Sequence, residues 1–129
     1  MDRLRDLLLV GGGGFLGSIA RYSLGGLVLH ATHGARFPAA TLTVNTLGCF
    51  TIGVLGGVAE HWNAFSPATR LFLFTGFLGG FTTYSAFAYE TVFLAREHLA
   101  LPAALNVALH LLLGLGAVAL GLWSARLAH

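Results

Sequence analysis

The stretch LFLFTGFLGGFTTYSAFAY, residues 71–89, decides the fold of this chain. It carries no formal charge and is close to the length of about 20 mostly apolar residues that a helix needs to cross a bilayer. In its middle, the adjacent Gly79 and Gly80 are followed by Thr82 and Thr83. Adjacent glycines weaken a helix, and hydroxyl groups can satisfy freed backbone groups. The stretch therefore predicts a membrane-spanning helix that is broken near Gly79 to Thr83.

Three more apolar stretches of similar length surround this one, at residues 7–29, 39–59 and 99–125, and only Arg21 interrupts the first of them. The connections between the four stretches are short and polar. We therefore predict an all-α integral membrane protein with four transmembrane helices, forming a single transmembrane domain over residues 1–129. The N-terminus also resembles a secretory signal peptide that ends near Ser18 to Ala20. Because glycines at 11–14 interrupt its apolar core, we expect this first helix to be retained.

The composition excludes several classes of protein. Hydrophobic residues make up 56% of the chain and charged residues only 9%, whereas a soluble domain carries about a quarter charged residues. Such a chain lacks the polar surface of a soluble enzyme. All its basic residues are arginines, and they are scattered along the chain, so there is no basic patch for a nucleic acid. No ATP-binding motif or catalytic constellation is present, and we expect no enzymatic activity.

The arginines also bear on how the chain inserts into a membrane. An even number of spans puts both termini on one side, and four arginines against two then fall on opposite sides: Arg3, Arg5, Arg70 and Arg126 against Arg36 and Arg96, with Arg21 inside the first span. This difference is a weak orientation signal under the positive-inside rule. It favours insertion in both orientations and an antiparallel homodimer.

Glycines in three spans have two possible meanings. Residues 12–17, GGGFLG, fit the G-x-G-x-x-G pattern of dinucleotide sites. Such a site also needs an acidic residue about 20 positions later, and the first acid after Asp6 is Glu60. Small residues four apart let membrane helices approach closely, and this explanation covers three pairs together: Gly13 with Gly17, Gly53 with Gly57, and Gly76 with Gly80.

Polar side chains within the spans are candidate functional residues, because they are costly in hydrocarbon. On one helix face lie Thr41, Asn45 and Cys49, and on another lie Asn106 and His110. Beyond the predicted break, the rings of Tyr84 and Phe87 share a side, and aromatic rings have a positive edge. Amides of Asn45 and Asn106 and hydroxyls of Thr83 and Ser85 supply further donors. With Glu90 and Glu97 expected at the membrane interface, this set favours a small anion over a cation.

Structural roles for the same residues stay open. Asn, Ser and Thr often only join membrane helices by hydrogen bonds, and Thr41 and Cys49 fit packing roles better than binding roles. Arg21 fits a pore mouth or a side chain that snorkels to the interface. His110 is either a donor or a satisfied buried histidine.

These residues together resemble the Fluc (also called CrcB) family of fluoride channels, along essentially the whole chain. The likeness rests on glycines 11–17 with Arg21-Tyr22, on Val44-Asn45-Thr46-Leu47-Gly48 with Gly53, and above all on residues 76–85, GFLGGFTTYS, with Phe87. Asn106, Gly114 and Gly121 add weaker support. Members of this family are four-helix proteins that work as dual-topology antiparallel homodimers.

The resemblance implies a function for particular residues. Asn45 would donate its amide to fluoride, and Phe87 would be one of the ring pair lining each of two pores. The second ring position falls on Tyr84, where the family commonly has phenylalanine. Backbone carbonyls of Gly79 and Thr82 would hold a structural Na⁺ shared between subunits. His110 falls where relatives often have serine.

The resemblance further implies passive fluoride efflux across the cytoplasmic membrane, which lowers the fluoride content of the cell. Two other classes of protein remain as alternatives. Small multidrug transporters also have four spans and antiparallel subunits, but they resemble one another in an embedded Glu in the first span, which this chain lacks. A structural subunit would use its polar residues only to join helices, and would transport nothing.

Overall fold

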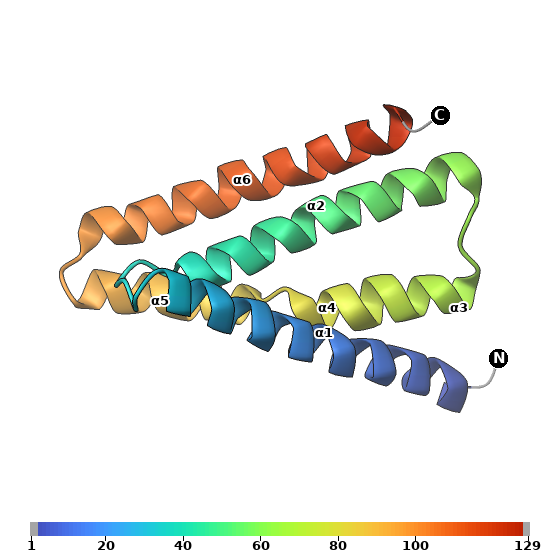
Figure 1. Ribbon diagram of the computed structural model, residues 1–129, viewed down its shortest axis with the longest axis horizontal. Helices are drawn as coiled ribbons and strands as arrows, with labels where there is room; N and C mark the ends of the chain where they lie inside the picture. The colour runs from blue at the N-terminus through green and yellow to red at the C-terminus, as the bar shows by residue number, and fades with distance from the viewer. Residues whose placement is uncertain (1–2, 128–129) are drawn as a thin grey trace.

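The computed structural model describes residues 3–127, all of them in helices or short connections (Figure 1). Residues 1–2 and 128–129 lie outside the described residues. Met1 and Asp2 are the first residues of the predicted domain and of the possible signal peptide. The elements in chain order are α1 (Arg3–Ala31), α2 (Ala39–Trp62), α3 (Pro67–Arg70), the π-helix η1 (Leu71–Leu78), α4 (Gly79–Phe81), α5 (Tyr84–Arg96) and α6 (Ala100–Leu127).

Four segments are long and apolar enough to cross a membrane: α1, α2, α6, and the run Pro67–Arg96 that comprises α3 to α5. This confirms the predicted all-helical protein with four membrane-crossing helices. Both ends of the described chain lie at the same end of an elongated bundle, together with the α2–α3 connection (Figure 1). Large apolar side chains are exposed on the bundle, for example Leu112 and Leu115 at 71% each. Lipid tails suit such a surface.

Close packing of glycines joins the helices in two pairs. Gly13 and Gly17 of α1 are buried against the backbone of the third span, where a Cβ added to Gly13 would lie 2.8 Å from the Phe77 nitrogen. Gly53 of α2 is buried against the backbone of α6 at Val118 and Gly121, and Gly57 is buried against the Ala125 side chain of α6. The predicted small-residue faces are confirmed. They pair α1 with η1 and α4, and α2 with α6.

The interruption predicted near Gly79 to Thr83 is found in part. Thr82 and Thr83 are extended, with φ/ψ of −84°/160° and −150°/115°. Gly79, however, remains right-handed helical, and Gly80 lies within α4. An added Cβ on Gly80 would be 2.9 Å from the Cα of Gly14, so close approach of α1 explains this glycine. The helix therefore ends after the glycines, at the two threonines.

Candidate functional site

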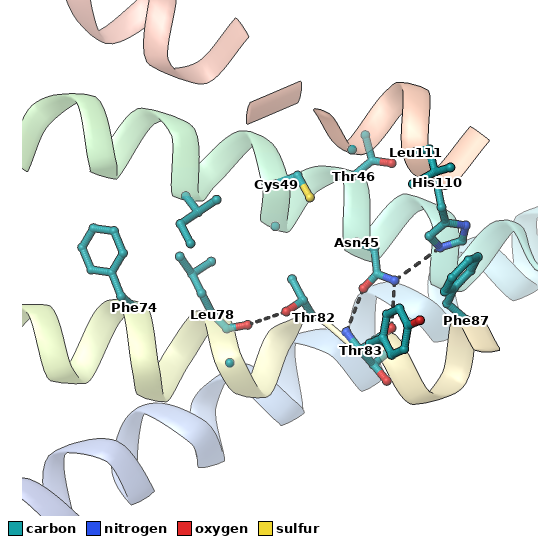
Figure 2. Close-up of a pocket in the computed structure, with 15 residues that line it drawn as sticks. Asn45, Thr46, Cys49, Phe74, Leu78, Thr82, Thr83, Phe87, His110 and Leu111 are labelled. Atoms are coloured by element: carbon teal, nitrogen blue, oxygen red, sulfur yellow. Dashed lines mark hydrogen bonds between the residues drawn. The ribbon is translucent and has the colours of Figure 1, made fainter. Parts of the chain in front are cut away.

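A cavity of about 450 Å³ opens beside the interruption, between α2, α6 and the third span (Figure 2). Its polar lining comes from the helix face and the interruption that the sequence singled out: Asn45, Thr46, Cys49, Thr82, Thr83, Tyr84 and His110, with Phe74, Leu78, Phe87 and Leu111 among the apolar members. Among residues 3–127, no Asp, Glu, Lys or Arg lines it. The cavity therefore offers amide, hydroxyl and ring groups and no formal charge.

Asn45 of α2 is paired with the main chain at the interruption. Its Oδ1 accepts from the Thr83 N–H at 2.8 Å, and its Nδ2 donates to the Thr83 carbonyl at 2.9 Å (Figure 2). A backbone donor and acceptor left unpaired in hydrocarbon would each cost several kcal/mol. The amide of Asn45 replaces the helical partners that Thr83 lacks, and so stabilises the extended conformation there.

Thr83 also begins the helix that follows. Its Oγ1 accepts from the Ala86 N–H at 3.2 Å, which is an N-cap on α5, and it lies 3.3 Å from Ser85 Oγ. Ser85 is exposed and does not line the cavity. The two predicted hydroxyl donors are thus brought together, and the oxygen of the Thr83 hydroxyl also accepts the hydrogen bond that caps α5.

Two backbone carbonyls at the interruption lose the N–H partners that a continuous helix would provide. In an unbroken helix, the Thr83 and Ala86 N–H groups would pair with the carbonyls of Gly79 and Thr82. They donate instead to Asn45 Oδ1 and Thr83 Oγ1. Gly79 and Thr82 both line the cavity, and Gly79 is exposed on the single chain. Oxygen ligands suit a hard cation, so the carbonyl oxygens of Gly79 and Thr82 fit the Na⁺ that the resemblance implies.

His110 of α6 reaches the same amide from the other side. Its Nε2 lies 3.3 Å from Asn45 Nδ2 (Figure 2). Its Nδ1 lies 2.9 Å from the Asn106 carbonyl oxygen one turn earlier. Both N–H groups of Asn45 are therefore engaged, one by Thr83 and one by His110. Donation from Asn45 to an anion requires one of these contacts to be released.

The two predicted rings lie at the cavity side by side. The Tyr84 and Phe87 ring centroids are 5.7 Å apart with planes inclined by 59°, and the Phe87 and His110 centroids are 4.3 Å apart. Tyr84 is 80% exposed. An edge of this ring pair is therefore accessible from the open side of the cavity.

Arg21 and Thr41 line a second cavity, of about 330 Å³, with Ser18 and Tyr22. Thr83 lines both cavities, so the interruption separates the two spaces. Arg21 is half-buried there. The structure places it beside a polar space and not within the first cavity.

Asn106 lies away from both cavities. It is fully buried, its Nδ2 donates to Thr91 Oγ1 at 2.9 Å, and its Oδ1 has no hydrogen-bond partner among the described residues. The side chain of Asn106 thus joins α6 to α5. The link from Asn106 to the cavity is the contact between its main-chain carbonyl and His110 Nδ1.

Glu90, which we expect at the membrane interface, has a partner that the sequence did not indicate. It is half-buried on α5, where its Oε1 accepts from Thr41 Oγ1 at 2.6 Å. Its Oε2 is buried and has no hydrogen-bond partner in the part of the chain that the structure describes. A carboxyl group therefore lies among the polar side chains that join α2 and α5, beside Thr41. The continuation of the helical pattern past Tyr89 to Arg96 was the signal that could have revealed it.

The fold and the site define a small four-span membrane protein with a largely apolar cavity at a helix interruption, which a few amide, hydroxyl and imidazole groups also line. The family model for "CrcB-like protein, Camphor Resistance (CrcB)" matches residues 8–122. The chain therefore belongs to the CrcB family, which confirms the resemblance drawn from its motifs.

Curated relatives match along most of their length. A protein of Chlorobium chlorochromatii is 48% identical over 126 residues, which cover 98% of this chain and 96% of the relative. A protein of Methylobacillus flagellatus is 47% identical over 90% of this chain and 91% of its own. One of Nitratidesulfovibrio vulgaris is 44% identical over 96% and 99%. Each of these relatives carries the name fluoride-specific ion channel FluC.

Proposed function

We propose that this protein is a fluoride-specific ion channel through which fluoride leaves the cell passively across the cytoplasmic membrane. The observation that carries the proposal is the cavity at the helix interruption, where amide, hydroxyl and ring groups stand among apolar side chains and no described lining residue is Asp, Glu, Lys or Arg. The chain that holds it is 44–48% identical to proteins named fluoride-specific ion channels. The channel is not an enzyme and needs no energy source, because fluoride flows down its own gradient.

The chemistry of the cavity suits a small, strongly hydrated anion. Such an ion enters only where donors replace its water, and it leaves only where no donor binds it too tightly. Asn45 and the edges of Tyr84 and Phe87 supply donors without a full positive charge. Thr83 and Ser85 lie at the same interruption, and Arg21 and Thr41 line the adjoining space, where a cationic side chain attracts anions toward the entrance.

The test of this function is ion-selective efflux from liposomes. Purified protein in liposomes loaded with potassium fluoride or potassium chloride, with valinomycin to carry the counter-ion, should release fluoride but not chloride. An ion-selective electrode records both. Protein-free liposomes give the leak of fluoride as HF. A folded preparation that releases no fluoride above this leak, or releases both anions equally, contradicts the proposal.

The working unit in this proposal is an antiparallel homodimer of chains inserted in both orientations. It is supported by the near-even division of the arginines and by the open side of the cavity, where Gly79 is exposed and Tyr84 is 80% exposed. A second copy would cover these groups. Four carbonyls, from Gly79 and Thr82 of both copies, would then hold a structural Na⁺ and link the subunits by its charge.

Removal of Na⁺ tests the dimer and the ion together. Light scattering in detergent should give two chains per particle when the protein is purified in Na⁺. Protein purified throughout in N-methylglucamine should unfold at a lower temperature and lose dimer. An ion that binds only the assembled state at 100 times its dissociation constant stabilises that state by about 2.7 kcal/mol. Equal unfolding temperatures and equal dimer content in both preparations would contradict a role for Na⁺ in the dimer.

A further inference from the structure

The contacts of His110 determine which of its nitrogens carries the proton. Its Nδ1 lies 2.9 Å from the Asn106 carbonyl oxygen. A carbonyl only accepts hydrogen bonds, so Nδ1 must be the donor. In the neutral ring Nε2 is then unprotonated and accepts from Asn45 Nδ2 at 3.3 Å. Neutral His110 therefore holds the second N–H of Asn45.

The orientation of the Asn45 amide is fixed independently of His110. Because the Thr83 N–H needs an acceptor and the Thr83 carbonyl needs a donor, Oδ1 and Nδ2 each have only one possible place. Nδ2 must therefore present its remaining hydrogen to His110. In a protonated imidazole both nitrogens are donors, and two N–H groups then face each other across 3.3 Å.

This conflict has two ways to be relieved. Rotation of the Asn45 amide by half a turn would give His110 an acceptor, but it would break both bonds to Thr83 and leave a backbone donor and acceptor unpaired. Those losses are large in a membrane. An anion in the cavity relieves the conflict without that loss, because it accepts from Asn45 Nδ2 and His110 Nε2 together. Charge-assisted bonds from an imidazolium are also the stronger kind.

We propose that His110 is a positioning residue for Asn45 and that its protonation turns their mutual hydrogen bond into a two-donor site for a small anion. The inference rests on the proposed fluoride function and names the side chain that regulates the same site. Histidine is the side chain that proteins most often use to couple a change of pH to a change of charge.

The groups around His110 come from α2 and α5. Glu90 on α5 is a half-buried acidic residue whose Oε1 accepts from Thr41 Oγ1 of α2. Phe87 on α5 lies against the ring at a centroid distance of 4.3 Å. Cys49 on α2 and Tyr84 on α5 line the same cavity as His110. Among the described residues, no Asp, Glu, Lys or Arg lines this cavity, and Glu90 is the acidic residue of the neighbouring helix α5.

Linkage makes the coupling measurable from either side. If protonation of His110 tightens anion binding, anion binding must increase protonation of His110 by the same factor. At a pH near 6.5, saturating fluoride should raise the ratio of protonated to neutral His110 by at least about fivefold, within the usual range of coupling between sites. Chloride at the same concentration should leave the ratio unchanged.

The experiment is ¹⁵N NMR of histidine-labelled full-length protein in lipid bilayers. Without fluoride at high pH, His110 should give the signals of the Nδ1-protonated tautomer. His61 offers a matched control, because its Nδ1 lies 2.9 Å from the Gly57 carbonyl in the same i to i−4 arrangement, and it does not line the cavity. Its protonated fraction should not respond to fluoride.

His110→Gln and His61→Gln assign the two signals. If His110→Gln does not fold, the His→Gln variants of the other histidines assign the His110 signal by elimination. A His110 signal in the Nε2-protonated tautomer, or a protonated fraction that fluoride does not change in protein that releases fluoride from liposomes, overturns the inference alone. Protein that releases no fluoride at any pH overturns the proposed function instead.

Discussion

Asn45→Asp should lower fluoride efflux at least about 100-fold. The change replaces an amide, which donates and accepts, by a carboxylate, which only accepts. Oδ1 still receives the Thr83 N–H, but the second oxygen now faces the Thr83 carbonyl, which is also an acceptor. Loss of buried hydrogen bonds of about 1–3 kcal/mol each, together with a fixed negative charge in an anion path, accounts for a loss of this size.

Efflux from liposomes, normalised to the amount of folded dimer, measures this effect. Asn63→Asp is the matched control, because Asn63 ends α2 outside the cavity in a left-handed conformation that Asp tolerates. It undergoes the same chemical change and should conduct like the unaltered protein. Wild-type efflux in Asn45→Asp would remove the Asn45 amide from the mechanism.

Gly17→Ala should destabilise the protein by about 1–3 kcal/mol, the usual cost of overpacking. An added Cβ would lie on the Phe77 carbonyl group, 2.9 Å from its carbon. Backbone atoms of the third span cannot move aside as a flexible side chain would, so α1 must separate from it. Because the half of the third span before the interruption packs on α1, we also expect efflux to fall.

Thermal unfolding in detergent measures the difference against Gly26→Ala. Gly26 lies on the same helix, and an added Cβ there meets nothing within 4 Å. Both variants gain the helix propensity of alanine over glycine, about 1 kcal/mol, so their difference isolates the clash. Equal unfolding temperatures for the two variants would contradict the close packing of α1 on the third span.

Features that depend on the residue pattern within one helix could be predicted from the sequence. The four spans, the small-residue pairs such as Gly13 with Gly17, and the shared side of Tyr84 and Phe87 all follow from the helical repeat. Each depends on residues a few positions apart. Length and periodicity therefore sufficed for the number of membrane-crossing helices and for the presence of a polar face.

Contacts between helices were not readable in this way. Asn45 and Thr83 are 38 positions apart, and Asn45 and His110 are 65 apart. The sequence named all three residues, but nothing in it fixes how far one helix is shifted along another. It therefore could not indicate that both N–H groups of Asn45 are already engaged. Nor could it show that the interruption falls at the threonines, where Asn45 reaches the main chain.

The partner of Glu90 could not be predicted for a related reason. The apolar stretch ends at Tyr89, and a charge that follows such a stretch is ordinarily taken as its boundary. The helix continues to Arg96, and Thr41 of α2 supplies a hydrogen bond to the carboxyl group. This bond joins two helices, and the pattern within one helix does not indicate it.

The pairing of Asn45 with Thr83 has a consequence for how this protein can vary. Asn45 contacts the main-chain N–H and C=O of residue 83 and not its side chain. Substitution at 83 therefore leaves these two bonds available, provided that the new residue still caps α5, whereas substitution at 45 removes them. The extended backbone of the third span therefore depends chiefly on the side-chain amide of Asn45. Substitutions at 45 should be tolerated far less than substitutions at 83.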